Sequence, residues 1–177
     1  MVDSNLTRRY ATALYHIAVK RGVLPRVSAD VNLLRDVILE NPRLLDALES
    51  PGAPPQKKKD VLQSLFREQM DPLTLQFCDL LIEHRRTAVL QNLQPVFQKL
   101  ADEAAGIIRA RVETAIPMSA EQEQQMRLRL SQLTGKNVIV TSSVDRSIRG
   151  GAVVWLGDRV IDGSVRGYLD EVQQRII

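Results

Sequence analysis

The chain has 177 residues, 44% of them hydrophobic and 25% charged, which is the composition of an ordinary soluble globular protein of one or two domains. Its net charge of +3 is spread evenly, with 14 basic against 13 acidic residues up to Ala105 and 10 against 8 after it, which excludes a concentrated basic tract. One cysteine, Cys78, excludes an internal disulfide and fits a reducing compartment, and no apolar run approaches the roughly 18 residues of a membrane span.

Six segments of the first 105 residues place hydrophobic side chains at helical spacing. We expect one helix in each of these ranges: 4–21, 23–40, 42–48, 54–66, 71–84 and about 87–104. Pro95 lies inside the sixth segment and predicts a kink there, because a proline removes one backbone hydrogen bond. Six amphipathic helices over this length predict a compact N-terminal bundle, residues 1–105.

The first and fifth of these helices carry more apolar surface than one core-facing stripe needs. In the first, Ala11, Tyr15 and Ala18 lie beside a complete apolar face. That face consists of Leu6, Tyr10, Ala13, Leu14 and Ile17. In the fifth, one face holds Leu73, Phe77, Leu80 and Leu81, and Leu75, Cys78 and Ile82 lie well round the helix. Such helices are either buried deep in a bundle or bind a partner with their second face.

After Ala105 the pattern changes from helices to a mixture of strands and helices. Alternation over 107–116 predicts a strand, although the sixth helix could run into it, and Ser119 with Gln122 predicts a capping box for a helix that ends at Gly135. Residues 138–140, 152–156 and 160–161 predict further strands, and the chain closes with a helix through Val165, Leu169, Val172 and Ile176. We therefore expect an α+β protein: a six-helix bundle followed by a small C-terminal α/β domain, residues 106–177.

The glycines and aspartates near the C-terminus predict turns and caps. Gly157 and Asp158 form a glycine-first, two-residue loop of the kind that closes a type II′ hairpin. Asp162 and Ser164 precede the last helix and offer oxygens to cap it. We assign structural turn or cap roles to these residues: Gly150, Gly151, Gly157, Asp158, Asp162, Gly163 and Ser164.

No pattern in the sequence predicts catalysis, a metal or a cofactor. His16 and His84 have no second histidine or carboxylate at the spacing of a helical metal pair, and Cys78 has no basic neighbour within a turn. The glycines form no phosphate-binding loop. A carboxylate pair, Asp158 and Asp162, could in principle perform acid–base chemistry, but the hairpin and the cap account for both.

Nucleic-acid binding is the strongest competing interpretation. It would use the arginines of the C-terminal part: Arg109, Arg111, Arg146, Arg149, Arg159 and Arg166. The interleaved aromatic residues on which single-stranded bases stack are missing, and Trp155 lies in an apolar run. The apolar excess on two helices therefore favours a protein-binding module over both an enzyme and a nucleic-acid binder.

The segment VIVTSSVDRSIRGGAVVWLGDRVIDGSVRGYLDEV closely resembles the C-terminal signature of the delta subunit of bacterial F-type ATP synthases, a family related to the mitochondrial oligomycin-sensitivity-conferring protein. The opening helix LTRRYATALYHIA is similar to that of the same family through Tyr10, Ala11, Ala13 and Leu14. The resemblance spans essentially the whole chain. It implies a non-catalytic stator subunit that links the alpha/beta head to the peripheral stalk, so that rotor torque drives ATP synthesis.

The resemblance also implies partners and contact residues. The N-terminal domain would receive N-terminal helices of the alpha subunits, and the C-terminal domain would hold the C-termini of the b subunits. The implied alpha-binding residues are Tyr10, Ala13, Leu14, Ile17, Leu75, Cys78, Asp79 and Ile82. The resemblance implies one copy per complex and no nucleic-acid partner. It also implies a peripheral protein on the cytoplasmic face of the bacterial plasma membrane, attached to the membrane only through the complex.

Overall fold

The computed structural model describes residues 4–157 and 159–168. Contacts divide the chain into two compact units, residues 1–101 (unit 1) and 102–177 (unit 2), so that the division falls inside the last helix of the first unit. Among the described residues, no helix is long and apolar enough to cross a membrane.

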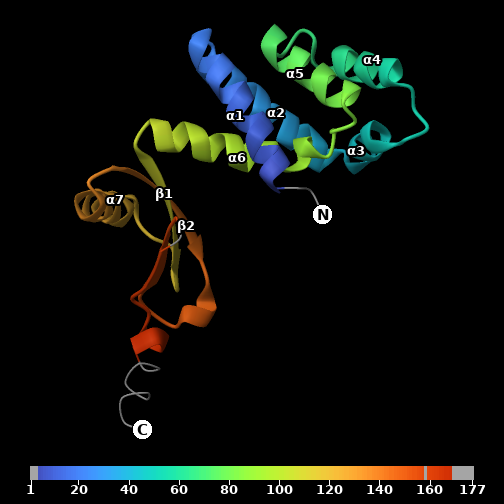
Figure 1. The fold of residues 1–177 in the computed structure, drawn as a ribbon. Coiled ribbons are helices and arrows are strands. Elements are labelled where there is room, and N and C mark those ends of the chain that lie inside the picture. Colours follow the sequence, from blue (N-terminus) through green and yellow to red (C-terminus); the bar gives the residue numbers. More distant parts are fainter. Residues whose placement is uncertain (1–3, 158, 169–177) are drawn as a thin grey trace. The chain divides into compact units, whose positions relative to one another are not determined.

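Unit 1 is helical (Figure 1). Its helices are α1 (Ser4–Lys20), α2 (Leu24–Glu40), α3 (Pro42–Glu49), α4 (Pro55–Phe66), α5 (Pro72–Glu83) and α6 (Val89–Ala104), the last extending into unit 2. Four of these helices have proline in the first turn, where its missing N–H has no intrahelical partner in any case. Gly22 ends α1 with a φ of 70°.

One apolar core holds these helices together. Its largest fully enclosed side chains include Phe97 of α6, Leu14 of α1 and Leu81 of α5. Each of the six helices contributes at least one side chain that is buried in this core or packed against it. The α6 helix continues through Pro95 as one element.

Unit 2 contains a mixed sheet with a helix. Its elements are β1 (Ile107–Thr114), α7 (Ala120–Thr134), β2 (Asn137–Val144), the 3-10 turn η1 (Arg146–Ile148), β3 (Ala152–Leu156) and β4 (Arg159–Asp162). The strand order within the described residues is β2-β1-β3-β4. Strand β1 pairs with β2 in parallel across α7, and the β1/β3 and β3/β4 pairs are antiparallel. The chain is therefore α+β, as its sequence predicts.

Local signals placed α7 correctly. The Ser119 hydroxyl accepts a hydrogen bond from the Gln122 backbone N–H at 3.2 Å, and the Gln122 side chain accepts one from the Ser119 N–H at 2.9 Å, which confirms the predicted capping box. The helix stops at Gly135, which has a φ of 67°. Residues 165–168 are helical as predicted, and the expected remainder of that helix, through Leu169, Val172 and Ile176, lies outside the described residues.

Two strand boundaries differ from the sequence prediction. Strand β1 ends at Thr114, two residues early, because the Thr114 hydroxyl donates to the Ile116 carbonyl at 2.7 Å and turns the chain. Strand β2 runs to Val144, well beyond the predicted 138–140, because its exposed polar half pairs with β1 through backbone groups. Strand β2 is an edge strand, so its sequence shows no clear alternation of polar and apolar residues.

A candidate protein-binding face on α1 and α5

The apolar residues of α1 form two neighbouring stripes. The stripe that faces the core consists of Thr7, Ala11, Leu14 and Ala18, all buried. The second stripe lies about 100° round the helix and consists of Leu6, Tyr10, Ala13 and Ile17. Ala13 is exposed and Ile17 is 42% exposed, so part of this second stripe faces solvent in the described chain.

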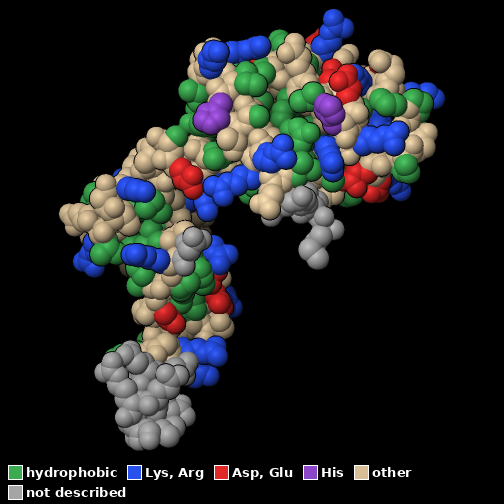
Figure 2. Space-filling view, viewed as in Figure 1, with side chains coloured by type: hydrophobic (Ala, Val, Ile, Leu, Met, Phe, Trp, Pro, Cys, Tyr) green, Lys and Arg blue, Asp and Glu red, His purple; other side chains and the backbone are tan. Residues whose placement is uncertain are grey.

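The second stripe of α1 contacts α5 through aromatic rings. Tyr10 and Phe77 meet edge to face, with ring centroids 6.3 Å apart and an interplanar angle of 70°. Leu80, one turn beyond Phe77 on α5, is 41% exposed. We call the set Tyr10, Ala13, Ile17, Phe77 and Leu80 the α1–α5 face, and Figure 2 shows hydrophobic side chains at the surface over these two helices.

The four contact residues that the sequence predicts on the fifth helix lie outside the α1–α5 face. The Asp79 carboxylate accepts a hydrogen bond at 3.4 Å from Gln63 of α4, so this line of α5 is directed toward α4. Cys78 and Ile82 are buried in the core, and Leu75 is half-buried against it. Leu14, predicted on the first helix, is also a core residue. In the structure Tyr10 contacts Phe77 instead. The sequence pattern places Phe77 on the same apolar face as Leu80.

The Cys78 thiol is chemically unreactive in the native state as well as buried in the core. Burial, followed by the negative charges of Asp79 and Asp30, raises the pKa of its thiol to about 12. The thiol therefore stays protonated near neutral pH, and a protonated buried thiol is a poor nucleophile.

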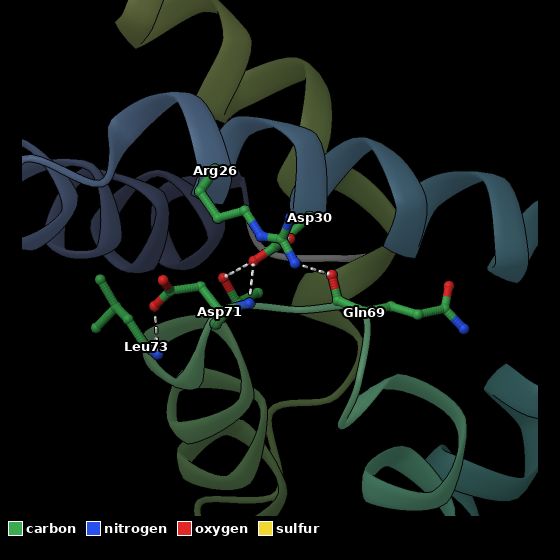
Figure 3. Close-up of polar contacts among 6 residues, drawn as sticks. Arg26, Asp30, Gln69, Asp71 and Leu73 are labelled. Carbon is green, nitrogen blue, oxygen red and sulfur yellow. Dashed lines mark hydrogen bonds and ion pairs between the residues drawn. The ribbon is translucent and has the colours of Figure 1, made fainter.

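A buried aspartate of α2 fixes the start of α5 (Figure 3). Asp30 is 2% exposed, and its Oδ2 accepts hydrogen bonds from the Asp71 backbone N–H at 2.8 Å and from the Thr74 hydroxyl at 2.7 Å. Asp71 itself caps α5 by accepting from the Leu73 N–H at 2.8 Å. These bonds satisfy donors that the first turn of a helix leaves free, and they tie α5 to α2 at one end.

Arg26 closes the same cluster from the solvent side. Its guanidinium lies 3.7 Å from Asp30 Oδ1 and donates to the Gln69 carbonyl at 2.6 Å, in the segment that precedes α5. A carboxylate buried in this way is accompanied by a cation and two donors, which offsets the cost of removing its charge from water.

The predicted turn and cap residues that precede β3 lie beside those that follow β4 in unit 2. Gly151 has a φ of 82°, and a Cβ there would lie 2.2 Å from the Gly163 carbonyl oxygen. The Gly163 N–H donates to the Ala152 carbonyl at 2.9 Å, and the Gly150 carbonyl accepts from the Val165 N–H at 3.0 Å. Two stretches of backbone thus cross here without room for a side chain on Gly151.

Ser164 and Asp162 form the cap of the helical segment 165–168. The Ser164 hydroxyl accepts from the Gly167 N–H at 2.9 Å, and Asp162 accepts from the Ser164 N–H at 2.8 Å. Hydrogen bonds from the hydroxyl and the N–H of Ser164 hold the pKa of the Asp162 carboxyl below its usual value. Gly157, with a φ of 58°, begins the two-residue loop between the paired residues Leu156 and Arg159, and Asp158 lies outside the described residues.

Two of the arginines considered for nucleic acid are engaged within unit 2. Arg109 forms an ion pair with Asp102 at 2.6 Å, and Arg111 lies over the Trp155 ring, 4.5 Å from its centroid. Among residues 4–157 and 159–168, no group of three histidine, cysteine, aspartate or glutamate side chains is placed to hold a metal ion.

Comparison with known proteins gives a consistent result over the full length. The family model described as ATP synthase delta (OSCP) subunit matches residues 6–176. ATP synthase subunit delta of Desulfitobacterium hafniense (strain DSM 10664 / DCB-2) is 34% identical over 176 residues, which cover 99% of this chain and 98% of that protein. The Salinibacter ruber subunit delta is 36% identical, over 99% of this chain and 93% of its own.

A solved structure has a similar fold. It is a chain of the cryo-EM structure of the Toxoplasma gondii mitochondrial ATP synthase hexamer, with a TM-score of 0.74, 24% identity and 97% of each chain covered. At this level of identity the similarity concerns the fold.

Proposed function

Because the chain belongs to the ATP synthase delta (OSCP) subunit family, we propose that it ties the catalytic head of an F-type ATP synthase to the peripheral stalk through its two units. A delta subunit is a component of the stator and is not itself catalytic. Without a stator, the catalytic head would rotate together with the rotor. The holding contacts therefore carry the function of this chain.

The head-binding part of the proposal rests on the α1–α5 face. In it, the helices of residues 1–105 act as a bundle that receives amphipathic N-terminal helices of the alpha subunits, which lie along Tyr10, Ala13 and Ile17 of α1. The observation that supports this best is the exposure of Ile17 and Leu80 beside the Tyr10–Phe77 contact, since exposed apolar side chains that lie together are a surface on which an amphipathic helix can place its apolar face.

The predicted contact residues that lie in or against the core support the α1–α5 face without being exposed on it. Leu14, Cys78 and Ile82 are buried in the core, and Leu75 packs against it, so we propose that they hold α1 and α5 in place. Asp79, which is bonded to Gln63, would play a similar supporting role. Direct contacts would then come from the outer residues, with Leu80 added on α5 and the buried Phe77 supporting them.

The stalk-binding part assigns the C-terminal α/β domain, residues 106–177, to the C-termini of the b subunits. A single copy would join the head and stalk at the cytoplasmic face of the bacterial plasma membrane, without its own contact with lipid. A contact that carries torque must dissociate slowly, and packed apolar helix surfaces favour slow dissociation.

A pull-down from membranes tests this proposal. The full chain with an affinity tag would be expressed in its own host, and membranes would be dissolved in mild detergent. We expect alpha and b subunits to be retained together with the chain. Retention of neither subunit would contradict the proposal, and salt-sensitive retention of RNA in their place would support the nucleic-acid alternative.

A further inference from the structure

The buried carboxylate of Asp30 has a place in the helical unit that packing alone does not explain. Asp30 is 2% exposed and Thr74, to which it is bonded, is fully buried. A buried charge with its partners is often no more stabilising than an apolar side chain of similar volume, whereas it can specify how two elements are placed. We therefore asked what the Asp30 contacts place.

The two hydrogen bonds to Asp30 restrict different movements of α5. The bond of 2.8 Å from the Asp71 N–H holds the residue that caps α5, and so fixes the position of the helix end. The bond of 2.7 Å from the Thr74 hydroxyl comes from a side chain that projects from the helix, and so fixes rotation about the axis. Figure 3 shows Asp30 above the start of α5, with Arg26 holding the preceding segment at Gln69.

Helix α5 carries this rotation to the α1–α5 face. Phe77 follows Thr74 by three residues and Leu80 follows Phe77 by three, each step about 4.5 Å along the axis. A helix is about 5 to 6 Å in radius with its side chains, so a rotation of about 20° at Thr74 would move the Leu80 side chain by about 2 Å. Apolar contacts weaken strongly over such a distance, and a partner helix would lose contact with Leu80 or with Ile17.

We propose that Asp30 is a positioning residue for the α1–α5 face, which holds α5 in the rotation that lets Ile17 and Leu80 contact the same partner helix. It acts from α2, outside the face itself. The proposal rests on the proposed function, in which this face receives an alpha-subunit helix, and adds the residue that keeps the face ready to bind. Without the Asp30 bonds, α5 would adopt this rotation for only a fraction of the time, and the apparent affinity would fall by that fraction.

A pair of substitutions at Thr74 separates positioning from stability. Binding of a synthetic alpha-subunit N-terminal peptide to the full chain is measured by calorimetry. Thr74→Val keeps the shape of the side chain but removes the hydroxyl that donates to Asp30, so the affinity should fall about threefold or more. Thr74→Ser is the matched control, because it keeps the hydroxyl and loses a buried methyl group. It should lower the melting temperature and change the affinity less than about twofold.

The association rate provides a second readout, measured by stopped flow with a fluorescently labelled alpha peptide. Asp30→Ala should weaken binding about tenfold, chiefly through slower association, because fewer molecules are competent at any moment. Adding Thr74→Val to Asp30→Ala should weaken binding no further, since the bond is already lost. Leu48→Ala is the control for lost stability. Leu48 is 1% exposed in α3, outside the Asp30 contacts and the face, so its loss should lower the melting temperature and leave the association rate unchanged.

Three results would overturn the inference. Wild-type affinity in both Thr74→Val and Asp30→Ala would show that Asp30 does not position the face, and would leave the proposed function standing. Losses as large in Thr74→Ser and Leu48→Ala would show that affinity follows stability alone. No binding by the wild type would contradict the proposed function as well. If Asp30→Ala fails to fold, the Thr74 pair decides the question by itself.

Discussion

Phe77 of α5 meets Tyr10 of α1 edge to face, with 6.3 Å between the ring centroids. This contact lies on the side of α5 that faces α1. An edge-to-face pair contributes about 1 kcal/mol beyond the burial of its area, so it favours one rotation of α5 over others. The outward neighbours of the two rings are then Ile17 and Leu80, and both remain partly exposed.

Asp30→Ala should destabilise the helical unit by about 3 kcal/mol, because the Asp71 N–H and the Thr74 hydroxyl would lose a charged acceptor in a buried place. Asp30→Asn, which keeps an acceptor oxygen, should cost less. The measurement is urea unfolding followed by the helical circular dichroism signal. Asp36→Ala is the control, since Asp36 pairs with Arg35 at the surface, and it should change the unfolding free energy by less than about 0.5 kcal/mol.

Cys78 should react with an aromatic disulfide reagent only when unit 1 opens. Its thiol is buried and has a pKa of about 12, so little thiolate forms in the native state below pH 9. We expect the labelling rate to rise by orders of magnitude in denaturant. Asp30→Ala should also raise the rate, because it lowers the free energy of opening. Fast labelling of the native wild type would show that α5 does not pack as described.

Gly151→Ala should destabilise unit 2 far more than Gly157→Ala. Both glycines have positive φ, which costs an alanine about 1 kcal/mol, but only Gly151 has a backbone oxygen 2.2 Å from the place of a new Cβ. A difference of at least about 2 kcal/mol is expected. Trp155, the one tryptophan of the chain, lies in unit 2, so its fluorescence reports unfolding of this unit. Equal effects of the two substitutions would argue against the crossing of residues 151 and 163.

The stability of unit 2 should fall as the pH drops through the acid range. The folded pKa of Asp162 is held below its unfolded value of about 3.9, so the unfolded chain binds the proton more readily below that pH. The stabilisation is therefore present above the unfolded pKa and is lost as the pH falls through the folded one. Asp162→Asn should flatten this slope in part, because the Asp145 pKa is lowered in the same way by Ser147.

The double variant Asp162→Asn/Ser164→Ala is the control for assigning this pH dependence to Asp162. Ser164→Ala should also reduce the slope in the wild type, since the Ser164 hydroxyl contributes most to the lowered pKa. In the Asp162→Asn background the same change should leave the slope as it is. A slope that Ser164→Ala reduces equally in both backgrounds would assign the effect to another carboxyl.

Features encoded within a few residues could be predicted from the sequence. The Ser119–Gln122 box and the two-residue loop at Gly157 each depend on neighbours in the chain, and both occur as predicted. The length of β2 could not be predicted, because an edge strand with polar side chains is stabilised by the backbone of β1 rather than by its own pattern.

The orientation of α5 likewise depends on contacts distant in sequence. Apolar residues surround most of this helix, so spacing alone leaves its rotation open. The structure settles the rotation through Tyr10, 67 positions before Phe77, and Asp30, 44 positions before Thr74. Phe77 and Leu80 already shared one face in the sequence, and this is the signal by which Leu80, the exposed residue of that face, could have been chosen.

Calorimetric binding of a synthetic alpha-subunit N-terminal peptide to the full chain tests the central claim most directly. Ile17→Asp and Ala13→Arg, both at exposed positions of the α1–α5 face, should weaken binding about tenfold or more while the chain stays folded. Val19→Asp is the matched control, because Val19 is 48% exposed on another side of the same helix, and it should change the affinity less than twofold. Unchanged affinity in Ile17→Asp and Ala13→Arg, or an equal loss in Val19→Asp, would contradict the account.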